Sequence, residues 1–352
     1  MKIIVLDGIS GVPLGKEIHG AFVEAGVPAV YTDVFEYKMR PFYKVSSVIL
    51  KTRNKAREKE GFSHLPRIEL KELEALVKRE APTHVLVIGF LYKHFDVKAA
   101  KALLEAHGAC LLLYDTDSCN LYSKRREFVY FIQQELPFYD HIFSFSKVTT
   151  RFFQDSLGLS ASHLPFGALP VEQLALGKSS EALFVGSADL RRVFLLESIR
   201  DRVSIRGNRW ERNYPLMSAS LRSRVDDRTV WGEELQALLQ SAKIVINITR
   251  SDFYGAETGV NLRIFEALAA GCFLLTDYCE EVGELFRAGE EIEVFRSAAE
   301  LKEKVRYYLE NESERERIAR NGHARFLSAH TWSSRVDQIR STVASLMLNR
   351  GA

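Results

Sequence analysis

Three polar residues stand close together in the stretch 242–277: Asn261, Arg263 and Glu266. The planar, permanently charged guanidinium of Arg263 suits the oxygens of a phosphate group. Glu266 follows one helical turn later beside apolar residues, where a carboxylate is costly to bury without hydrogen-bond donors such as the two hydroxyls of a ribose. The trio favours an anionic ligand that carries a ribose, and an ordinary ion pair between Arg263 and Glu266 is the alternative.

A strand, a loop and a helix must position this trio. The apolar run Lys243–Ile248 predicts a buried strand, and Thr258 is placed to cap a helix that begins at Gly259. Free backbone amides at such a helix start attract anions. In open parallel sheets ligands bind beyond the carboxyl ends of the strands, which is where the loop 249–257 lies.

Two more arginines follow predicted strands at the same edge, namely Arg206 and Arg250. Several cations that converge on one edge of a sheet favour a polyanionic ligand. A diphosphate at the helix start with a ribose one turn further on describes a nucleoside diphosphate. We therefore expect Glu266 to bind the ribose, and we expect four residues to contact the diphosphate: Arg206, Arg250, Asn261 and Arg263.

Short apolar runs alternate with helical spacing along most of the chain, which predicts parallel sheets in an α/β fold. A polar stretch at 170–181 reads as a linker between two series of this kind. We expect two doubly wound, Rossmann-like domains, 1–168 and 178–332, with the final helix 333–352 crossing back onto the first.

The bulk composition excludes several classes of protein. With 352 residues, of which 46% are hydrophobic, and a net charge of +2, the chain has room for two cores and no general affinity for nucleic acid. Its four cysteines form no Cys-x-x-Cys pair, which argues against disulfide and zinc frameworks. The sequence shows no signal peptide or membrane-spanning run, so a cytoplasmic protein is expected.

The motif from Asn261 to Ala267, followed by Ala270-Gly271 and Leu274–Asp277, resembles the CgeB-like glycosyltransferases, within the group-one glycosyltransferases of the GT-B fold. Weaker likeness extends over 181–335. The resemblance implies two facing domains and transfer of a sugar from a nucleoside diphosphate sugar to a hydroxyl acceptor, with no cofactor and no essential metal. Ser187 and Asn247 lie in matching stretches and are taken as further donor-binding residues.

One departure from the family concerns a second glutamate. Retaining group-one enzymes usually carry two glutamates with seven residues between them, whereas the matching position before Glu266 is Thr258, and the nearest glutamate, Glu257, is one residue too far. The sequence therefore leaves open whether the anomeric centre is retained or inverted.

In the first domain, Ser10 and Gly11 lie in a loop after the first strand that fails the phosphate-loop pattern. We expect them to line the cleft and to help bind acceptor or donor diphosphate. Asp115 follows a predicted strand and is our candidate general base for the acceptor hydroxyl. Its alternatives are a structural cap and, through Asp115-Thr116-Asp117, a metal ligand.

Residues 38–59 are rich in lysine and arginine interleaved with apolar side chains. A solvated amphipathic helix accounts for this pattern, and the alternative is a surface for an anionic acceptor or for a membrane. Two other activities fit the same fold: a sugar-nucleotide epimerase, and a non-catalytic subunit that binds nucleotide sugars.

Overall fold

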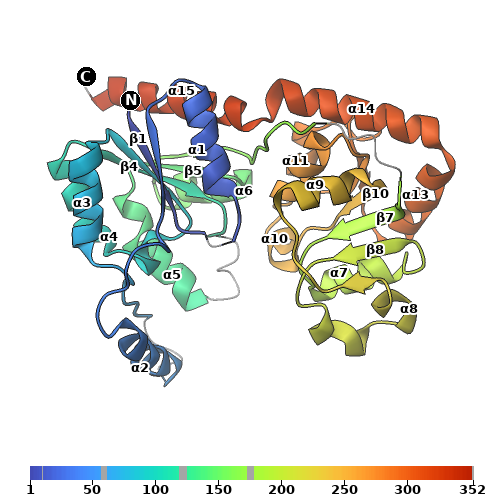
Figure 1. Cartoon of the computed structure of the whole chain (residues 1–352), viewed down its shortest axis with the longest axis horizontal. Coiled ribbons are helices and arrows are strands. Elements are labelled where there is room, and N and C mark those ends of the chain that lie inside the picture. The colour runs from blue at the N-terminus through green and yellow to red at the C-terminus, as the bar shows by residue number, and fades with distance from the viewer. Residues whose placement is uncertain (10, 57–61, 119–124, 173–177, 351–352) are drawn as a thin grey trace. The chain divides into compact units, whose positions relative to one another are not determined.

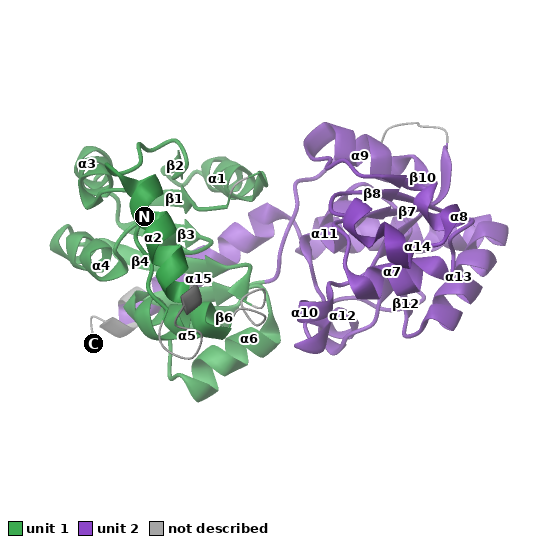
Figure 2. Cartoon of the chain, turned by 90° about the horizontal axis from the view of Figure 1, so that it is seen from below, with its two compact units in different colours: residues 1–164 green, residues 165–352 purple. Residues whose placement is uncertain are grey.

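The computed structural model describes residues 1–9, 11–56, 62–118, 125–172 and 178–350. The chain divides into two compact units, Met1–Leu164 and Pro165–Ala352 (Figure 2). Each unit contains one six-stranded sheet whose neighbouring strands are all parallel. The predicted α/β architecture with two parallel sheets is confirmed.

The sheet of the first unit has the strand order β2-β1-β3-β4-β5-β6 (Figure 1). Its strands are β1 (Ile3–Asp7), β2 (Ala29–Asp33), β3 (His84–Ile88), β4 (Cys110–Asp115), β5 (His141–Ser144) and β6 (Ala161–His163). Its helices are α1 (Leu14–Glu24), α2 (Tyr43–Ala56), α3 (Leu70–Glu80), α4 (Val97–Ala106), α5 (Arg125–Gln134) and α6 (Lys147–Arg151). Shorter helical turns are η1 (Leu91–Lys93), η3 (Leu136–Phe138) and η4 (Phe152–Ser156).

The sheet of the second unit has the strand order β12-β11-β10-β7-β8-β9. Its strands are β7 (Ser180–Val185), β8 (Val203–Arg206), β9 (Val225–Asp226), β10 (Ala242–Asn247), β11 (Leu274–Asp277) and β12 (Glu293–Phe295). Its helices are η5 (Glu211–Leu216), α7 (Leu190–Glu197), α8 (Ala219–Arg222), α9 (Gly232–Gln240), α10 (Ser251–Gly255), α11 (Leu262–Ala269), α12 (Glu280–Leu285), α13 (Ala298–Glu310), α14 (Glu312–Ala329) and α15 (Trp332–Arg350).

The central strands are buried on both faces, which explains their nearly continuous apolar sequences. All five residues of β1 and of β3 are buried, and so are the last four residues of β10. A parallel sheet covered by helices on both sides requires such runs, because neither face meets water.

Three strands escape prediction because their sequences are short or polar. β2 is half-buried along its whole length at the edge of its sheet, and β9 has only two residues. β12 carries a glutamate, Glu293, that is buried because Tyr308 and Lys304 donate hydrogen bonds to it. A buried, fully bonded carboxylate does not look like a core residue in the sequence.

The start of α15 is fixed within the second unit by Arg335. Its guanidinium donates to the carbonyl oxygens of Phe166 and Ala329, both at 3.0 Å, and to Nδ1 of His330 at 2.8 Å. A parallel bridge joins Ala168 to Thr331 nearby. Residues 166–168 are therefore part of the second unit, and the predicted return of the last helix to the first domain stays a prediction.

Candidate functional site

Three predicted donor-site residues lie at the carboxyl edge of the second sheet. Arg206 and Asn247 are the last residues of β8 and β10, and Ser187 follows β7 by two residues. Val185 of β7 is in register with Arg206, and Asn247 is in register with Thr276 of β11. The structure thus brings these residues to one edge, the edge at which open parallel sheets bind ligands.

The ends of β7 and β8 approach each other backbone to backbone. Gly207, with φ of +154°, has so little space that a Cβ atom there would collide with the carbonyl group of Gly186. The indole of Trp210 donates to the same carbonyl oxygen at 3.0 Å. This close approach fixes the position of Arg206, which directly precedes the glycine.

The helix that carries the trio begins later than its sequence predicts. Asn261, not Thr258, is the N-cap of α11, and its side-chain oxygen accepts from the amide of Arg263 at 3.1 Å. Thr258 lies three residues before this cap, and its hydroxyl donates to the buried carboxylate of Glu281 at 3.0 Å. The helix ends before Gly271, whose backbone is left-handed with φ of +66°.

Arg263 and Glu266 form the ion pair that the sequence offers as an alternative. Nη1 of Arg263 lies 2.6 Å from Oε2 of Glu266, and the two side chains are only 13% and 10% exposed. Nε of Arg263 is buried and, among the described residues, has no hydrogen-bond acceptor. An unsatisfied buried donor costs about 1–3 kcal/mol, so the guanidinium retains capacity for a further acceptor.

Arg206 and Arg250 differ in what surrounds their charges. Arg206 pairs with Asp226, the last residue of β9, which the sequence did not indicate. Arg250 is half-buried directly before α10, and no carboxylate of the described residues lies within ion-pair distance of it. Its neighbour is the ring of Phe253, 6.0 Å from the guanidinium carbon. Arg250 is therefore the predicted cation best placed to gain an anion.

A buried aspartate that sequence reasoning missed organises the same edge. Asp277, at the end of β11, accepts from the amide and hydroxyl of Thr249, both at 2.9 Å, and from Arg191 at 2.6 Å. The Arg191 guanidinium stacks over the ring of Tyr254, 3.6 Å from its centroid. Asp277 thereby joins the ends of β10 and β11 to the start of α7.

Arg192, which the sequence reasoning also missed, is buried next to the strand ends at this edge. It is buried and donates to the carbonyl oxygens of Ile248 and Ser187, at 2.7 Å in each case. Burial, together with the nearby charge of Arg250, lowers the pKa of Arg192 to about 10, so the group stays cationic at neutral pH. The detectable signal was the pair Arg191-Arg192 in the first turn of α7, after the N-cap Asp189.

In the first unit, Asp115 ends β4 as a buried carboxylate with several donors. It accepts from the Ser118 hydroxyl at 2.7 Å, the Ser144 hydroxyl at 3.0 Å and the amides of Ser118 and Asp117. Burial raises its pKa above the usual 3.8, and these hydrogen bonds partly oppose the rise. The bonds suffice to explain Asp115 as a structural group, and its role as a base stays a prediction.

Asp7, at the end of β1, is a second buried carboxylate at this edge that the sequence reasoning missed. It accepts from the amide of Ile9 at 2.9 Å and from the Tyr31 hydroxyl at 3.1 Å, and burial raises its pKa. The loop that follows contains Gly11, which is exposed in a left-handed turn with φ of +80°. Ser10 lies outside the described residues.

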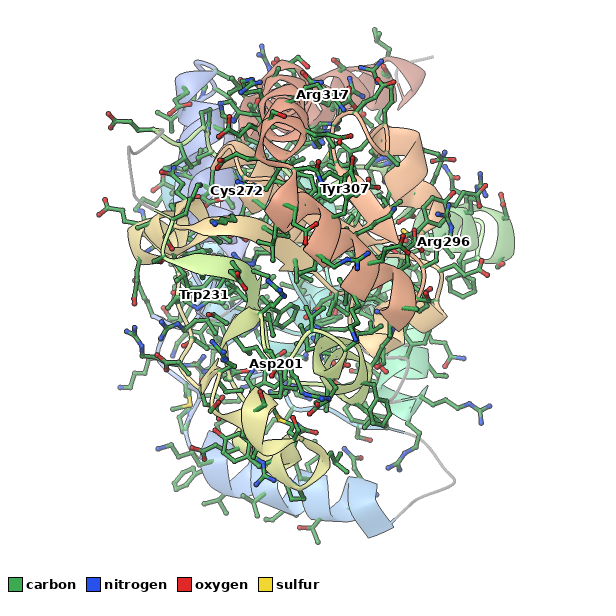
Figure 3. The ribbon with its side chains drawn as sticks, turned by 90° about the vertical axis from the view of Figure 1, so that its right-hand side faces the viewer. Asp201, Trp231, Cys272, Arg296, Tyr307 and Arg317 are labelled. Carbon is green, nitrogen blue, oxygen red and sulfur yellow. The ribbon has the colours of Figure 1, made fainter. Side chains whose placement is uncertain are left out.

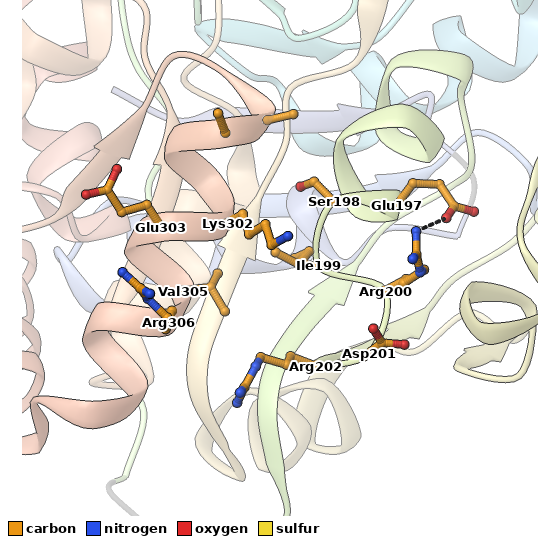
Figure 4. A pocket seen from close by; sticks show the side chains of 12 residues that line it. Glu197, Ser198, Ile199, Arg200, Asp201, Arg202, Lys302, Glu303, Val305 and Arg306 are labelled. Atoms are coloured by element: carbon orange, nitrogen blue, oxygen red, sulfur yellow. Dashed lines mark ion pairs between the residues drawn. The ribbon is translucent and has the colours of Figure 1, made fainter.

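The second unit also has an open cavity of about 730 Å³ away from this edge (Figure 4), and Asp201, one of its lining residues, is labelled in Figure 3. It lies between α13 and the segment from the end of α7 to the start of β8, which is the amino end of that strand. Basic and acidic side chains alternate in its wall, and Arg200 pairs with Glu197 at 3.9 Å (Figure 4). It is therefore separate from the predicted donor site.

Among the described residues, no three His, Cys, Asp or Glu side chains cluster as ligands of a metal ion would. Within the same part of the chain, no helix is both long and apolar enough to cross a membrane. The prediction that the reaction needs no metal stays a prediction.

Residues 191–341 match the family model described as "Glycosyl transferase-like". This segment is glycosyl transferase-like. It includes six of the predicted donor-site residues, namely Arg206, Asn247, Arg250, Asn261, Arg263 and Glu266. The CgeB-like subfamily is finer than this match and stays a prediction.

Solved structures share the fold over nearly the whole chain. Sucrose-phosphate synthase from Thermosynechococcus elongatus is 11% identical with a TM-score of 0.66, and the alignment covers 99% of this chain and 100% of that one. The Anabaena protein HepE, described in complex with UDP-glucose, is 14% identical with a TM-score of 0.63 and coverage of 98% and 100%. A Listeria monocytogenes protein, described provisionally as a UDP-N-acetylglucosamine 2-epimerase, is 13% identical with a TM-score of 0.52 and coverage of 99% and 98%.

No curated protein sequence matches the chain significantly. The structural neighbours establish the GT-B fold, and the glycosyl transferase-like segment lies in its second unit. Together they support sugar transfer in general.

Proposed function

We propose that this chain transfers a sugar from a nucleoside diphosphate sugar to a hydroxyl acceptor without an essential metal ion. The observation that carries the proposal is Arg250, a half-buried cation with no carboxylate partner among the described residues, in the loop between β10 and α11. A half-buried charge of this kind is stabilised when an anion binds beside it. Because ligands of open parallel sheets bind at this edge, a diphosphate is the anion that fits.

The proposed role of each side chain follows from the charge and the hydrogen-bonding groups that its contacts within the protein leave unused. Arg250 and Arg263 bind the diphosphate, the latter through donors that Glu266 leaves unused. Glu266 accepts hydrogen bonds from the ribose hydroxyls. Arg206 contacts the diphosphate while it keeps its ion pair with Asp226. The remaining members of the proposed donor site are Ser187, Asn247 and Asn261.

Transfer breaks the bond between the anomeric carbon and the diphosphate oxygen and forms one to the acceptor oxygen. Negative charge develops on the departing nucleoside diphosphate, and cations fixed beside it stabilise that charge. The same cations take the place of a metal ion in this proposal. Its donor class is supported by the neighbour HepE, which is described in complexes with UDP and with UDP-glucose.

Asp115 is the proposed acceptor of the proton from the attacking hydroxyl. Its raised pKa suits a proton acceptor, whereas its hydrogen bonds to Ser118 and Ser144 fit a structural role. The substitution Asp115→Asn separates the two. A base predicts loss of turnover with unchanged donor binding, and near-normal turnover would remove Asp115 from the reaction.

Donor binding is tested by thermal shift against a panel of nucleoside diphosphates and their sugars. A ligand at a hundredfold excess over its Kd stabilises the folded state by about 2.7 kcal/mol, which is a readily measured rise in Tm. Arg263→Ala should abolish the shift and Glu266→Ala should weaken it. Arg250→Gln should weaken binding about tenfold or more, because it removes charge-assisted hydrogen bonds.

Arg200→Gln is the matched control, since Arg200 is a half-exposed arginine of the same unit at the opposite cavity. Its shifts should equal those of the wild type. If no nucleotide raises the Tm of the wild type, the proposed donor site is wrong.

Three reactions are then distinguished by their products. Transfer releases nucleoside diphosphate only when acceptor is present, an epimerase isomerises the donor alone, and a binding subunit does neither. Turnover that survives a chelator supports independence from metal, and turnover restored only by added Mg²⁺ contradicts it.

A further inference from the structure

The helix α2 of the first unit turns an apolar face outward instead of inward. Phe42, directly before the helix, is 84% exposed, and Val45, Val48 and Ile49 are exposed by 62%, 61% and 64%. Successive residues of a helix are 100° apart, so positions 45, 48, 49 and 52 form one continuous stripe, and Phe42 precedes its first turn. A soluble helix normally packs this stripe against its own core.

The opposite face of α2 is the one that is fastened to the protein. The Asn54 side chain exchanges two hydrogen bonds with the backbone of Ser63, at 2.7 and 3.1 Å. Arg126 at the start of α5 donates to the carbonyl oxygen of Asn54 at 2.7 Å. Polar contacts therefore hold the helix in place while its apolar stripe stays uncovered, and α2 projects from the rest of its unit (Figure 1).

Two details at the ends of the stripe fit contact with an apolar phase. Phe42 adopts a left-handed backbone with φ of +56°, a conformation that costs a non-glycine residue about 1–2 kcal/mol. Thr52 donates its hydroxyl to the carbonyl oxygen of Val48 at 3.0 Å, which satisfies its only polar group within the helix. Backbone strain that exposes a large aromatic ring points to a ligand rather than to stability.

The positive charges on both sides of the stripe indicate that its binding partner is anionic. Lys44 and Lys51 flank one side of it and Arg53 the other, and all three are exposed. From Tyr37 to Lys55 the sequence contains six lysines or arginines and no aspartate or glutamate. An exposed apolar stripe between two basic borders is the pattern of helices that lie in the interface of an anionic membrane.

We propose that α2 docks the protein on the surface of a membrane rich in anionic lipid, with the stripe inserted at the headgroup level and the cations against the phosphates. A membrane is favoured over a protein partner because the stretch Tyr37–Lys55 contains cations and no acidic residue, so the stripe has a single sign of charge along both borders. The proposal goes beyond the proposed transfer reaction and does not depend on the donor site.

Vesicle flotation tests the proposal without any nucleotide. The wild type should float with vesicles of equal parts phosphatidylcholine and phosphatidylglycerol, float less with phosphatidylcholine alone, and detach as salt is added. Lys44→Gln with Lys51→Gln should weaken binding about thirtyfold, which is the equivalent of about 1 kcal/mol per charge. The triple change Val45→Ser, Val48→Ser and Ile49→Ser should weaken it by more than about tenfold.

Matched controls carry the same changes elsewhere on the surface. Phe194→Ser removes a 60% exposed apolar side chain from α7, and Lys98→Gln removes an exposed cation from α4. Both should bind as the wild type does. All altered side chains are exposed, and circular dichroism should show unchanged folding in every variant.

Hydrogen exchange gives a second readout, because residues 42–56 should become protected only on anionic vesicles. Equal binding to both vesicle types would overturn the proposal. So would binding that the serine variant keeps and only the glutamine variant loses, since that result indicates an acidic polymer or protein instead of a membrane.

Discussion

The two sheets carry different charged side chains at the carboxyl ends of their strands. In the first unit, Asp7 and Asp115 end their strands buried, and both accept hydrogen bonds from hydroxyls and amides. In the second, Asp277 ends its strand bonded to the guanidinium of Arg191, with Arg206 and Arg250 beside the neighbouring strand ends. Similar architecture thus carries uncompensated carboxylates in one unit and an excess of arginines in the other.

This difference shows two ways of tolerating charge at the end of a buried strand. In the first unit burial raises the pKa of Asp7 and Asp115, so protonation relieves part of the cost. In the second unit Arg191 compensates Asp277, and Arg250 is left over. Only the second edge is therefore suited to bind an anion, whereas the first is suited to hold or move a proton.

The largest effect is expected where the ion pair is broken. Asp277→Ala leaves Arg191 and Thr249 without their acceptor, so the free energy of unfolding should fall by about 3–5 kcal/mol. Asp226→Ala removes the partner of Arg206, but the Asp226 side chain is 52% exposed and the loss should stay below about 1 kcal/mol. Urea denaturation measures both. Equal losses would mean that Asp277 is not the centre of its edge.

A smaller loss of stability is expected when the glycine that follows a strand is replaced, and the loss should differ between the two sheets. Gly207 after β8 would place a Cβ against the carbonyl of Gly186, so Gly207→Ala should cost about 2–3 kcal/mol. Gly8 after β1 leaves 2.9 Å to the carbonyl oxygen of Ile88, and Gly8→Ala should cost about 1 kcal/mol. Chemical denaturation of the two variants measures both losses in the free energy of unfolding. The reverse order would show that the second edge is not the tighter one.

The smallest effect is the dependence on pH that comes from buried carboxyl groups of the first unit. Glu135 is fully buried, accepts from the amides of Leu91 and Tyr92, and has a pKa raised to about 7 by burial. A carboxyl group with a raised pKa binds more protons when folded. The contribution of Glu135 to the free energy of unfolding therefore falls as the pH rises from the unfolded pKa of 4.5 through about 7.

The pKa of Asp115 is also raised by burial, so its contribution to the free energy of unfolding likewise falls as the pH rises above 3.8. Glu135→Gln and Asp115→Asn should each flatten this slope, whatever they do to stability at a single pH. Denaturation curves recorded at several pH values measure it. A slope unchanged in both variants would contradict the assignment.

Sequence patterns predicted the sheets better than the site. Runs such as Ile3–Leu6 and Ile244–Ile248 identify themselves because strands buried on both faces need continuous apolar residues. Arg263 and Glu266 were found because polar residues on a packed helix face are unusual. Arg191 and Asp277 were missed because they lie far apart in sequence, and only the folded sheet brings them within 2.6 Å.

Local reasoning also failed at the helix cap. Thr258 and Asn261 both have suitable side chains, but Asn261 accepts from the amide of Arg263, whereas the Thr258 hydroxyl donates to Glu281 from a later part of the chain. The sequence left both alternatives open for α2, since an apolar stripe alone does not say whether a core covers it.

The strand order of the second sheet has a consequence for synthesis. The chain makes β7, β8 and β9 in succession, but the other edge of β7 pairs with β10, which is complete only at residue 247. Until then a nascent chain carries an apolar strand with an unpaired row of amides and carbonyls, the kind of edge that recruits other chains. The slow step of folding on the ribosome is expected there, and chaperones should bind that stage most.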